Sequence, residues 1–295
     1  PFQKFAIDAI ASGNHSLSCV PTGSGKTLPA IFAIMHFTGA IKKKVIYTSP
    51  IKALSNQKYY EFTQKFPSLS IGLLTGDNKI NPEADILIMT AEILQNTLYK
   101  KTQTTAEFIN PLLLFEMDFD NDLACIIHDE VHMINDQDRG SVWENIILMT
   151  PPHIQMVMLS ATLDNPSRFA SWIESRTFKF ETGEAKKEVY LATSSFRPVP
   201  LTHYSFITAT SALFKSIKDK DEKERIKKLI NKPHTILSSS GKFDEHKYHQ
   251  LQNVIDIIKI KQVFVRRSFV LNEACKYLVT NKMLPAVCFI LSKKQ

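Results

Sequence analysis

The stretch VPTGSGKT, from Val20 to Thr27, constrains the fold of this chain more than any other part of the sequence. A strand-like run, Ser16–Val20, leads into it, and a helical pattern, Lys26–Phe37, follows it. Glycines let a backbone turn tightly and point its N–H groups at phosphate oxygens, and the N-terminus of the next helix adds partial positive charge. The stretch therefore predicts a nucleotide-binding loop, called the phosphate loop below (residues 20–27). The usual pattern has Gly where this chain has Val20.

Six residues of this loop are candidates for contact with the nucleotide. In loops of this kind the lysine reaches the outer phosphates, which is the role that we predict for Lys26. The hydroxyl that follows holds Mg²⁺, which we predict for Thr27. The full set of candidates is Thr22, Gly23, Ser24, Gly25, Lys26 and Thr27.

A second polar stretch, IIHDEVHMIND, has two interpretations. A zinc protease needs HExxH on a helix, whereas the order here is H-D-E-V-H and the preceding LACIIH is an apolar strand. An acid at the carboxyl end of a parallel strand would instead lie beside the phosphate loop. We therefore predict that Asp129 holds Mg²⁺ and that Glu130 polarises the water that attacks the γ-phosphate. His132 is expected to couple hydrolysis to other events, and His128 to be structural.

The first 180 residues alternate between short apolar runs and helical patterns, which predicts an α/β fold with a doubly wound parallel sheet. The expected strands are Ser16–Val20, Lys44–Thr48, Ile71–Leu74, Ile86–Met89, Leu123–Ile127 and Gln155–Leu159. The expected helices are Lys26–Phe37, Ile51–Phe66, Ala91–Lys100, Val142–Met149 and Ser167–Ile173. One stretch, Lys100–Asp122, interrupts the alternation and is interpreted as an insertion.

The remaining residues give a weaker pattern and a different charge. Strands are expected at Val189–Thr193, Leu201–Phe206 and Ala286–Leu291, helices at Leu213–Ile230, Tyr248–Ile258 and Ser268–Thr280, and a loop at Thr235–Phe243. Residues 181–295 hold 21 basic and 11 acidic residues, net +10, whereas residues 1–180 hold 15 basic and 18 acidic, net −3. The basic part indicates either a polyanionic partner or a solvated lysine-rich surface.

Composition narrows the class of protein further. No run of eighteen apolar residues is present, so no membrane span is expected. The four cysteines lie far apart without CxxC spacing, which favours reduced thiols in an intracellular protein, cytoplasmic or nuclear. The chain begins PFQKFAIDAI, without Met or a signal-peptide pattern, and we expect the natural chain to be longer.

With Lys26 and the DEVH segment in place, the chain resembles superfamily 2 helicases, in particular the superkiller-type (Ski-like) DExH-box RNA helicases. The resemblance covers about two thirds of the 295 residues. It rests on YTSPIKALSNQK (47–58), GLLTGD (72–77), IMTAEIL (88–94), DEVHMINDQDRGSVWE (129–144) and LSATLDNP (159–166). RPVPLTHY (197–204) is similar to the family's entry to a second lobe, and LPAVCFILSKK (284–294) to that lobe's first nucleic-acid motif.

The resemblance implies a RecA-like ATP-binding lobe over residues 1–180. It also implies part of a second RecA-like lobe, with a basic insertion, over residues 181–295. ATP and Mg²⁺ are the implied cofactors, and RNA is the implied partner, together with proteins of an RNA-decay complex. The family's later motifs, including an arginine that completes the ATP site, do not follow LSKK in this chain. We therefore expect this stretch alone to bind nucleotide weakly and to hydrolyse it poorly.

The resemblance also implies roles for individual residues. Gln3 matches the glutamine that reads adenine, and Ser160 and Thr162 match the motif that couples hydrolysis to strand movement. Arg139 is left open between a structural and a functional role. The positions that match contacts to the nucleic-acid backbone or its loops are Pro50, Lys52, Gly76, Thr90 and Glu92.

The function that these features favour is an ATP-dependent RNA helicase, which hydrolyses ATP to translocate on RNA and unwind it. A DNA helicase of the same superfamily is one alternative, because contacts to the backbone do not distinguish the sugar. A nucleotide-gated module that binds RNA without unwinding it is another. The zinc hydrolase is the most distant alternative.

Overall fold

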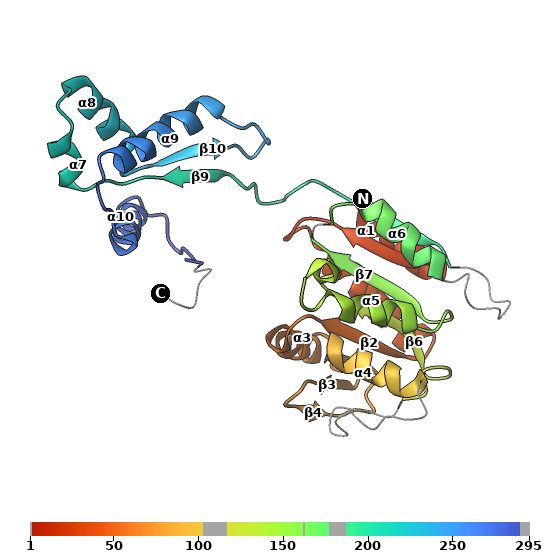
Figure 1. The fold of residues 1–295 in the computed structure, drawn as a ribbon. Coiled ribbons are helices and arrows are strands. Elements are labelled where there is room, and N and C mark those ends of the chain that lie inside the picture. The colour runs from red at the N-terminus through yellow and green to blue at the C-terminus, as the bar shows by residue number, and fades with distance from the viewer. Residues whose placement is uncertain (1, 103–116, 162, 177–186, 290–295) are drawn as a thin grey trace. The chain divides into compact units, whose positions relative to one another are not determined.

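A computed structural model describes residues 2–102, 117–161, 163–176 and 187–289. The chain forms two compact units, residues 1–198 and residues 199–295, coloured red to green and green to blue in Figure 1. This division follows Pro198, eighteen residues after the domain boundary expected at residue 180. The reason is that strand β8 (Val189–Thr193) pairs in parallel with β1 (His15–Cys19) and so belongs to the first unit.

The first unit is built on a sheet with eight strands in its described residues, in the order β4-β3-β5-β2-β6-β7-β1-β8. Neighbouring strands are parallel except β4, which runs antiparallel to β3. The parallel sheet predicted from the sequence is thus confirmed. The remaining strands are β2 Lys44–Ser49, β3 Ile71–Leu74, β4 Lys79–Ile80, β5 Ile86–Thr90, β6 Leu123–His128 and β7 Gln155–Ser160.

Helices cover both faces of this sheet (Figure 1), as the near-continuous apolar strands require. On one face, α1 (Phe2–Ala11), α2 (Thr27–Met35), the π-helical turn η1 (His36–Ala40) and α3 (Lys52–Lys65) bury a core against the strands. On the other face, α4 (Ala91–Thr102), α5 (Gly140–Met149) and α6 (Pro166–Ser175) bury a second core. A short 3₁₀ helix, η3 (Val131–Asn135), follows β6.

The strand register places the residues of interest at one edge of the sheet. Cys19 of β1 lies opposite Ser160 of β7, and Thr48 of β2 lies opposite His128 of β6. The segments that leave these carboxyl ends are the phosphate loop, the turn before α3 and the DEVH segment. In open α/β sheets, ligands bind at this edge.

The second unit is smaller and has its own core. Strands β9 (His203–Phe206) and β10 (Pro233–Leu237) form an antiparallel pair, and α9 (Glu245–Ile260) lies along β10. The other helices are α7 (Ser211–Ser216), α8 (Lys220–Leu229) and α10 (Arg267–Thr280). An antiparallel pair is not the parallel sheet of a RecA-like lobe, so the identity of this unit as part of a second lobe stays a prediction.

Several local predictions for this unit are wrong. The helix expected over 213–230 is two helices, because the chain is extended at Ile217 and the Asp219 side chain caps a new helix start. The loop expected at 235–243 begins as strand β10. Residues 286–289 are not a strand, and 290–291 lie outside the described residues.

Helix α1, strand β4 and the short 3₁₀ helix η3 of the first unit were not predicted. Of the insertion, residues 103–116 lie outside the described ranges. None of the helices in the described ranges combines the length and the apolar character that crossing a membrane requires.

Candidate nucleotide and nucleic-acid sites

The phosphate loop has the conformation that its glycines permit. Gly23 and Gly25 adopt φ values of +85° and +82°, in the left-handed region that disfavours side chains. Gln3 of α1 donates a hydrogen bond from Nε2 to the Gly25 carbonyl, at 3.1 Å. A Cβ atom on Gly25 would lie 2.6 Å from that Nε2 atom, so the glycine allows the close approach. The candidate adenine-reading residue therefore lies against the loop that would hold the phosphates.

Lys26 and Glu130 form an ion pair at the centre of the site. The Lys26 ammonium lies 2.7 Å from Glu130 Oε1, and the two side chains are 11% and 26% exposed. Glu130 occupies the left-handed region, with φ 52° and ψ 45°, at the sharp turn between β6 and η3. The two predicted catalytic residues, 104 positions apart in sequence, are thus in direct contact.

Asp129 is largely buried and has two hydrogen-bond donors of its own. Its Oδ2 atom accepts from the Tyr47 hydroxyl at 2.5 Å, and its Oδ1 atom accepts from the Glu130 backbone N–H at 3.0 Å. Burial raises the pKa of the Asp129 carboxyl, and the Tyr47 hydrogen bond opposes that rise. Burial also raises the pKa of Tyr47 well above its usual range, with the Asp129 charge adding to the effect. The tyrosine is therefore a neutral donor that orients the carboxylate.

The residues at this site fit a magnesium ion. A carboxylate and a hydroxyl are oxygen ligands of the kind that Mg²⁺ takes, usually with several waters and the substrate phosphates completing its shell. Asp129 directly follows β6 and has an oriented carboxylate, and Thr27 opens α2 directly after Lys26. In the described ranges, no group of three His, Cys, Asp or Glu side chains is placed together in the way that a zinc site requires.

The two histidines of the DEVH region lie in different surroundings. His132 Nδ1 lies 3.3 Å from Glu130 Oε2, a close approach without good hydrogen-bond geometry. His128 is fully buried, and its Nδ1 atom lies 3.3 Å from the Thr48 hydroxyl. Burial, with a smaller effect of Arg176, lowers the pKa of His128 to about 3, so it is a neutral residue of the core. The contact of His132 with Glu130 agrees with a coupling role without testing it.

Two further segments meet the phosphate loop. The Val20 backbone N–H donates to the Ser160 carbonyl at 3.1 Å, so the end of β7 is bonded to the start of the loop. The Ser24 hydroxyl donates to the Phe196 carbonyl at 3.2 Å, which attaches the segment after β8 to the loop. Ser160 is fully buried. Thr162, its predicted partner in coupling, lies outside the described residues.

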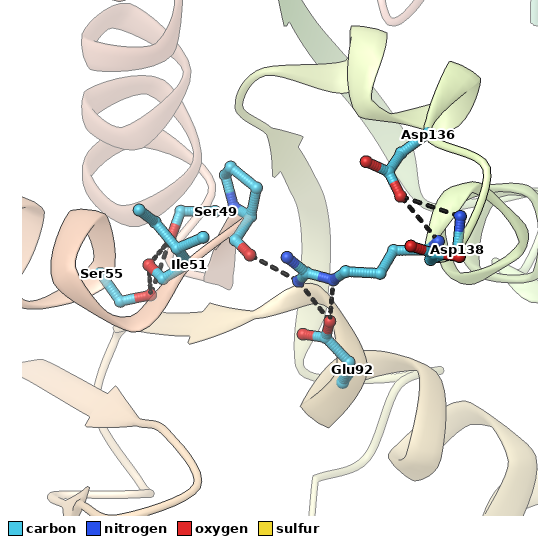
Figure 2. A network of polar contacts seen from close by, with 8 residues as sticks. Ser49, Ile51, Ser55, Glu92, Asp136 and Asp138 are labelled. Atoms are coloured by element: carbon cyan, nitrogen blue, oxygen red, sulfur yellow. Dashed lines mark hydrogen bonds and ion pairs between the residues drawn. The ribbon is translucent and has the colours of Figure 1, made fainter. Parts of the chain in front are cut away.

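A second site lies at the same edge of the sheet. A pocket of about 400 Å³ is lined by Pro50, Ile51, Lys52, Gly76, Thr90, Glu92, Ile93, Asn96 and Arg139. All five residues predicted to contact nucleic acid are among these, although they come from three separate segments of the chain. The turn before α3 is fixed by a 2.6 Å hydrogen bond between the Ser49 and Ser55 hydroxyls (Figure 2). The structure thus gathers the predicted residues, while their role in binding remains a prediction.

Charged pairs line this pocket. The Lys52 ammonium lies 2.6 Å from Asp77 Oδ2 on an exposed surface, and a Cβ atom on Gly76 would lie 3.1 Å from that ammonium. The Arg139 guanidinium donates from Nε and Nη2 to Glu92 Oε1, and from Nη2 to the Pro50 carbonyl at 2.5 Å (Figure 2). Arg139, whose role the sequence left open between structural and functional, thus lines the pocket and contacts two of its residues.

Sequence reasoning missed the role of Tyr47. Tyr47 lies in the middle of an apolar strand, so the sequence indicates only that its ring packs in the core. A signal was present, because a buried tyrosine hydroxyl usually finds a partner. The partner was not predictable from the strand alone, since it is set by the pairing of β2 with β6.

Comparison with known proteins agrees with the motifs. The family model described as DEAD/DEAH box helicase matches residues 1–169. The chain is 36% identical over 313 residues to "DExH-box ATP-dependent RNA helicase DExH15 chloroplastic" of Arabidopsis thaliana, an alignment that covers 99% of this chain and 25% of that protein.

Two further relatives match about two thirds of the chain. It is 42% identical over 200 residues to "Antiviral helicase SKI2" of Saccharomyces cerevisiae, covering 68% of this chain and 14% of that protein. It is 41% identical over 210 residues to "Superkiller complex protein 2" of Homo sapiens, covering 70% and 14%. The chain thus spans a quarter or less of the length of these relatives.

Proposed function

The chain belongs to the DEAD/DEAH box helicase family, and we propose that it is the ATP-binding part of an ATP-dependent RNA helicase that translocates on RNA and unwinds it. The observation that carries the proposal is the 2.7 Å contact between Lys26 and Glu130. This contact joins the phosphate loop to the DEVH segment, at the sheet edge that also holds the nucleic-acid pocket. RNA as the substrate is supported by the relatives, whose printed names include ATP-dependent RNA helicases.

In the nucleotide site, each residue has a part that follows from its position. The triphosphate would replace Glu130 as the partner of Lys26, because phosphate oxygens carry more charge and loops of this kind direct their N–H groups at phosphate. Glu130, released from the ion pair, would then accept the proton of the attacking water. Gln3, at the Gly25 carbonyl, would hold the adenine edge close to the loop.

Magnesium, when held by Thr27 and Asp129, would neutralise charge on the outer phosphates. Tyr47 keeps the Asp129 carboxylate oriented before the ion arrives. His132, beside Glu130, would couple hydrolysis to movement, and Ser160 would do so through its bond to the start of the phosphate loop.

In the nucleic-acid pocket, Lys52, the Gly76 backbone and Thr90 would hold the phosphodiester backbone, with the turn that contains Pro50 beside it. Contacts of this kind supply affinity and carry little sequence information. Strand β2 connects the two sites, because it holds Tyr47 on the nucleotide side and ends at the turn that contains Pro50. Through β2, nucleotide binding could therefore affect the nucleic-acid pocket directly.

The full-length protein is the right object for the test. We expect RNA-stimulated ATP hydrolysis and displacement of a paired RNA strand, both lost in Lys26→Ala. Unchanged turnover in Lys26→Ala would refute the assignment. Competition between RNA and DNA single strands of one sequence separates the RNA helicase from a DNA helicase. ATPase activity without strand displacement would favour the RNA-binding module that does not unwind.

The setting of this activity is also a proposal. Relatives named "Superkiller complex protein 2" point to work within a complex, and we infer partners from RNA-decay machinery. We also propose an intracellular setting, cytoplasmic or nuclear, because the cysteines lie far apart in sequence without CxxC spacing.

A further inference from the structure

Arg139 is anchored by its own backbone before its side chain reaches the pocket. Its N–H donates to Asp136 Oδ1 at 2.9 Å, and the Asp138 N–H donates to the same atom at 3.1 Å (Figure 2). The guanidinium carbon lies 5.6 Å from the ring of Trp143, a fully buried residue of α5. These contacts fix the direction in which the arginine extends.

The side chain then joins two segments that the chain itself does not connect. Glu92 stands in the first turn of α4, and Pro50 lies in the turn between β2 and α3. The planar guanidinium contacts both at once, which a lysine ammonium on a flexible stem does poorly. Arg139 and Glu92 are 34% and 39% exposed, so water reaches the pair only in part.

The pairing also changes the charge of the pocket. Glu92 is a carboxylate in a site that is proposed to bind phosphates, and an unpaired carboxylate there would repel them. Paired with Arg139, Glu92 belongs to an ion pair with no net charge, which repels a polyanion less than a lone carboxylate does. The bond from Arg139 also holds the Pro50 carbonyl toward the arginine, where it accepts a hydrogen bond.

We propose that Arg139 is a positioning residue of the nucleic-acid pocket, which acts by neutralising Glu92 and fixing the Pro50 turn rather than by contacting phosphate. The proposal rests on the proposed function, because it assigns the parts of that pocket. It changes the expectation for Glu92, whose carboxylate serves as the partner of the arginine instead of a contact to nucleic acid. It also connects the segment that begins at the DEVH motif, residues 129–144, to the nucleic-acid pocket.

The test is a double-mutant cycle on the full-length protein, with a short fluorescent oligouridine as the probe. Arg139→Gln leaves Glu92 unpaired, and we expect the Kd to rise about tenfold. Adding Glu92→Gln removes the exposed charge and places two amides side by side, so the double variant should recover most of that loss. Glu92→Gln alone should lower the Kd by up to about threefold, since one negative charge leaves the pocket. Arg168→Gln, on the exposed surface of α6, is the control for losing one arginine charge elsewhere.

Salt titration distinguishes a positioning role of Arg139 from a direct contact with phosphate. Each lost phosphate contact reduces the slope of log K against log salt by roughly 0.7 for single strands. We expect the double variant to keep the slope of the unsubstituted chain. A reduced slope, or a double variant no better than Arg139→Gln, would overturn the proposal, and so would a loss of affinity in Glu92→Gln as large as that in Arg139→Gln.

Thermal unfolding without RNA provides the second measurement. Arg139→Gln should lower the Tm, and adding Glu92→Gln should restore part of it, because an unpaired half-buried carboxylate is removed. Additive effects on the Tm in this cycle would show that Arg139 and Glu92 are not coupled. That result would overturn the positioning role of Arg139, whatever the RNA data show. Failure of the unsubstituted chain to bind oligouridine, with coupling intact in the unfolding cycle, would instead contradict the proposed function.

Discussion

The Tyr47 hydroxyl donates a 2.5 Å hydrogen bond to Asp129 Oδ2, and this bond joins strand β2 to the DEVH segment inside the sheet edge. Tyr47 is fully buried and Asp129 nearly so, so the carboxylate has few waters to replace a lost donor. A hydrogen bond to a charged group of this kind contributes about 1.5–3 kcal/mol. The orientation of the carboxylate therefore depends on a residue of the neighbouring strand.

Tyr47→Phe tests this dependence. We expect the Mg²⁺ concentration for half-maximal ATP hydrolysis by the full-length protein to rise several-fold. The free energy of unfolding should fall by about 1.5–3 kcal/mol because a buried carboxylate loses a donor. Tyr60→Phe is the matched control, since Tyr60 is 68% exposed. A Mg²⁺ dependence in Tyr47→Phe equal to that of the control would count against the orienting role.

Glu130→Gln should separate nucleotide binding from hydrolysis. The variant breaks the 2.7 Å ion pair and frees Lys26 for phosphate, so the Kd for a fluorescent ATP analogue should fall several-fold. Hydrolysis should drop by about 10²-fold or more, because the base is lost. Lys26→Ala is the comparison, and it should lose both. Weaker nucleotide binding in Glu130→Gln would show that the pair does not compete with the triphosphate.

The fold of the first unit was predictable because its parallel strands are buried on both faces. Runs such as LACIIH are apolar throughout, and β6 (Leu123–His128) extends one residue beyond the predicted strand. The loop between β1 and α2 was predictable because glycine adopts its φ values far more readily than other residues. The family resemblance predicted from the motifs is confirmed by the match over residues 1–169.

What was missed depends on pairing between segments far apart in sequence. Tyr47 meets Asp129 only because β2 and β6 are neighbours, and Arg139 meets Glu92 only because the loop before α5 returns to the start of α4. Helix α8 was fused to its neighbour in the prediction, because its charged residues continue a helical pattern across the cap at Asp219. Local patterns contain no information about these partners.

Gly25→Ala should disturb the phosphate loop from within. The new Cβ atom would lie 2.6 Å from Gln3 Nε2 and would need a φ of +82°, which costs an L-residue roughly 1–2 kcal/mol. We expect nucleotide affinity to fall at least about tenfold, as a 1.4 kcal/mol loss would produce. Gly39→Ala, where a Cβ atom meets nothing within 4 Å, is the control. Equal affinities for the two variants would mean that the loop conformation does not need its glycine.

His15 should make the stability of the chain depend on pH. It is fully buried, and its Nδ1 atom accepts a hydrogen bond from the Met156 N–H at 2.9 Å. Burial, with smaller effects of neighbouring charges, lowers the pKa of His15 from 6.5 to about 3. The unfolded chain therefore binds a proton between these values that the folded chain does not. The stability contribution is present above pH 6.5 and is lost as the pH falls toward 3.

Urea unfolding at pH 7 and pH 5 measures the effect. Because His15 takes up a proton only in the unfolded chain, its contribution to the free energy of unfolding should be about 2 kcal/mol smaller at pH 5 than at pH 7. His15→Gln keeps an acceptor for Met156 and cannot titrate, so its loss of stability between the two pH values should be smaller by that amount. Buried His128 shares this behaviour and remains in the variant, which is why only part of the dependence should disappear. If the variant and the unsubstituted chain lost the same stability between pH 7 and pH 5, His15 would have to be protonated, or accessible to solvent, in the folded state.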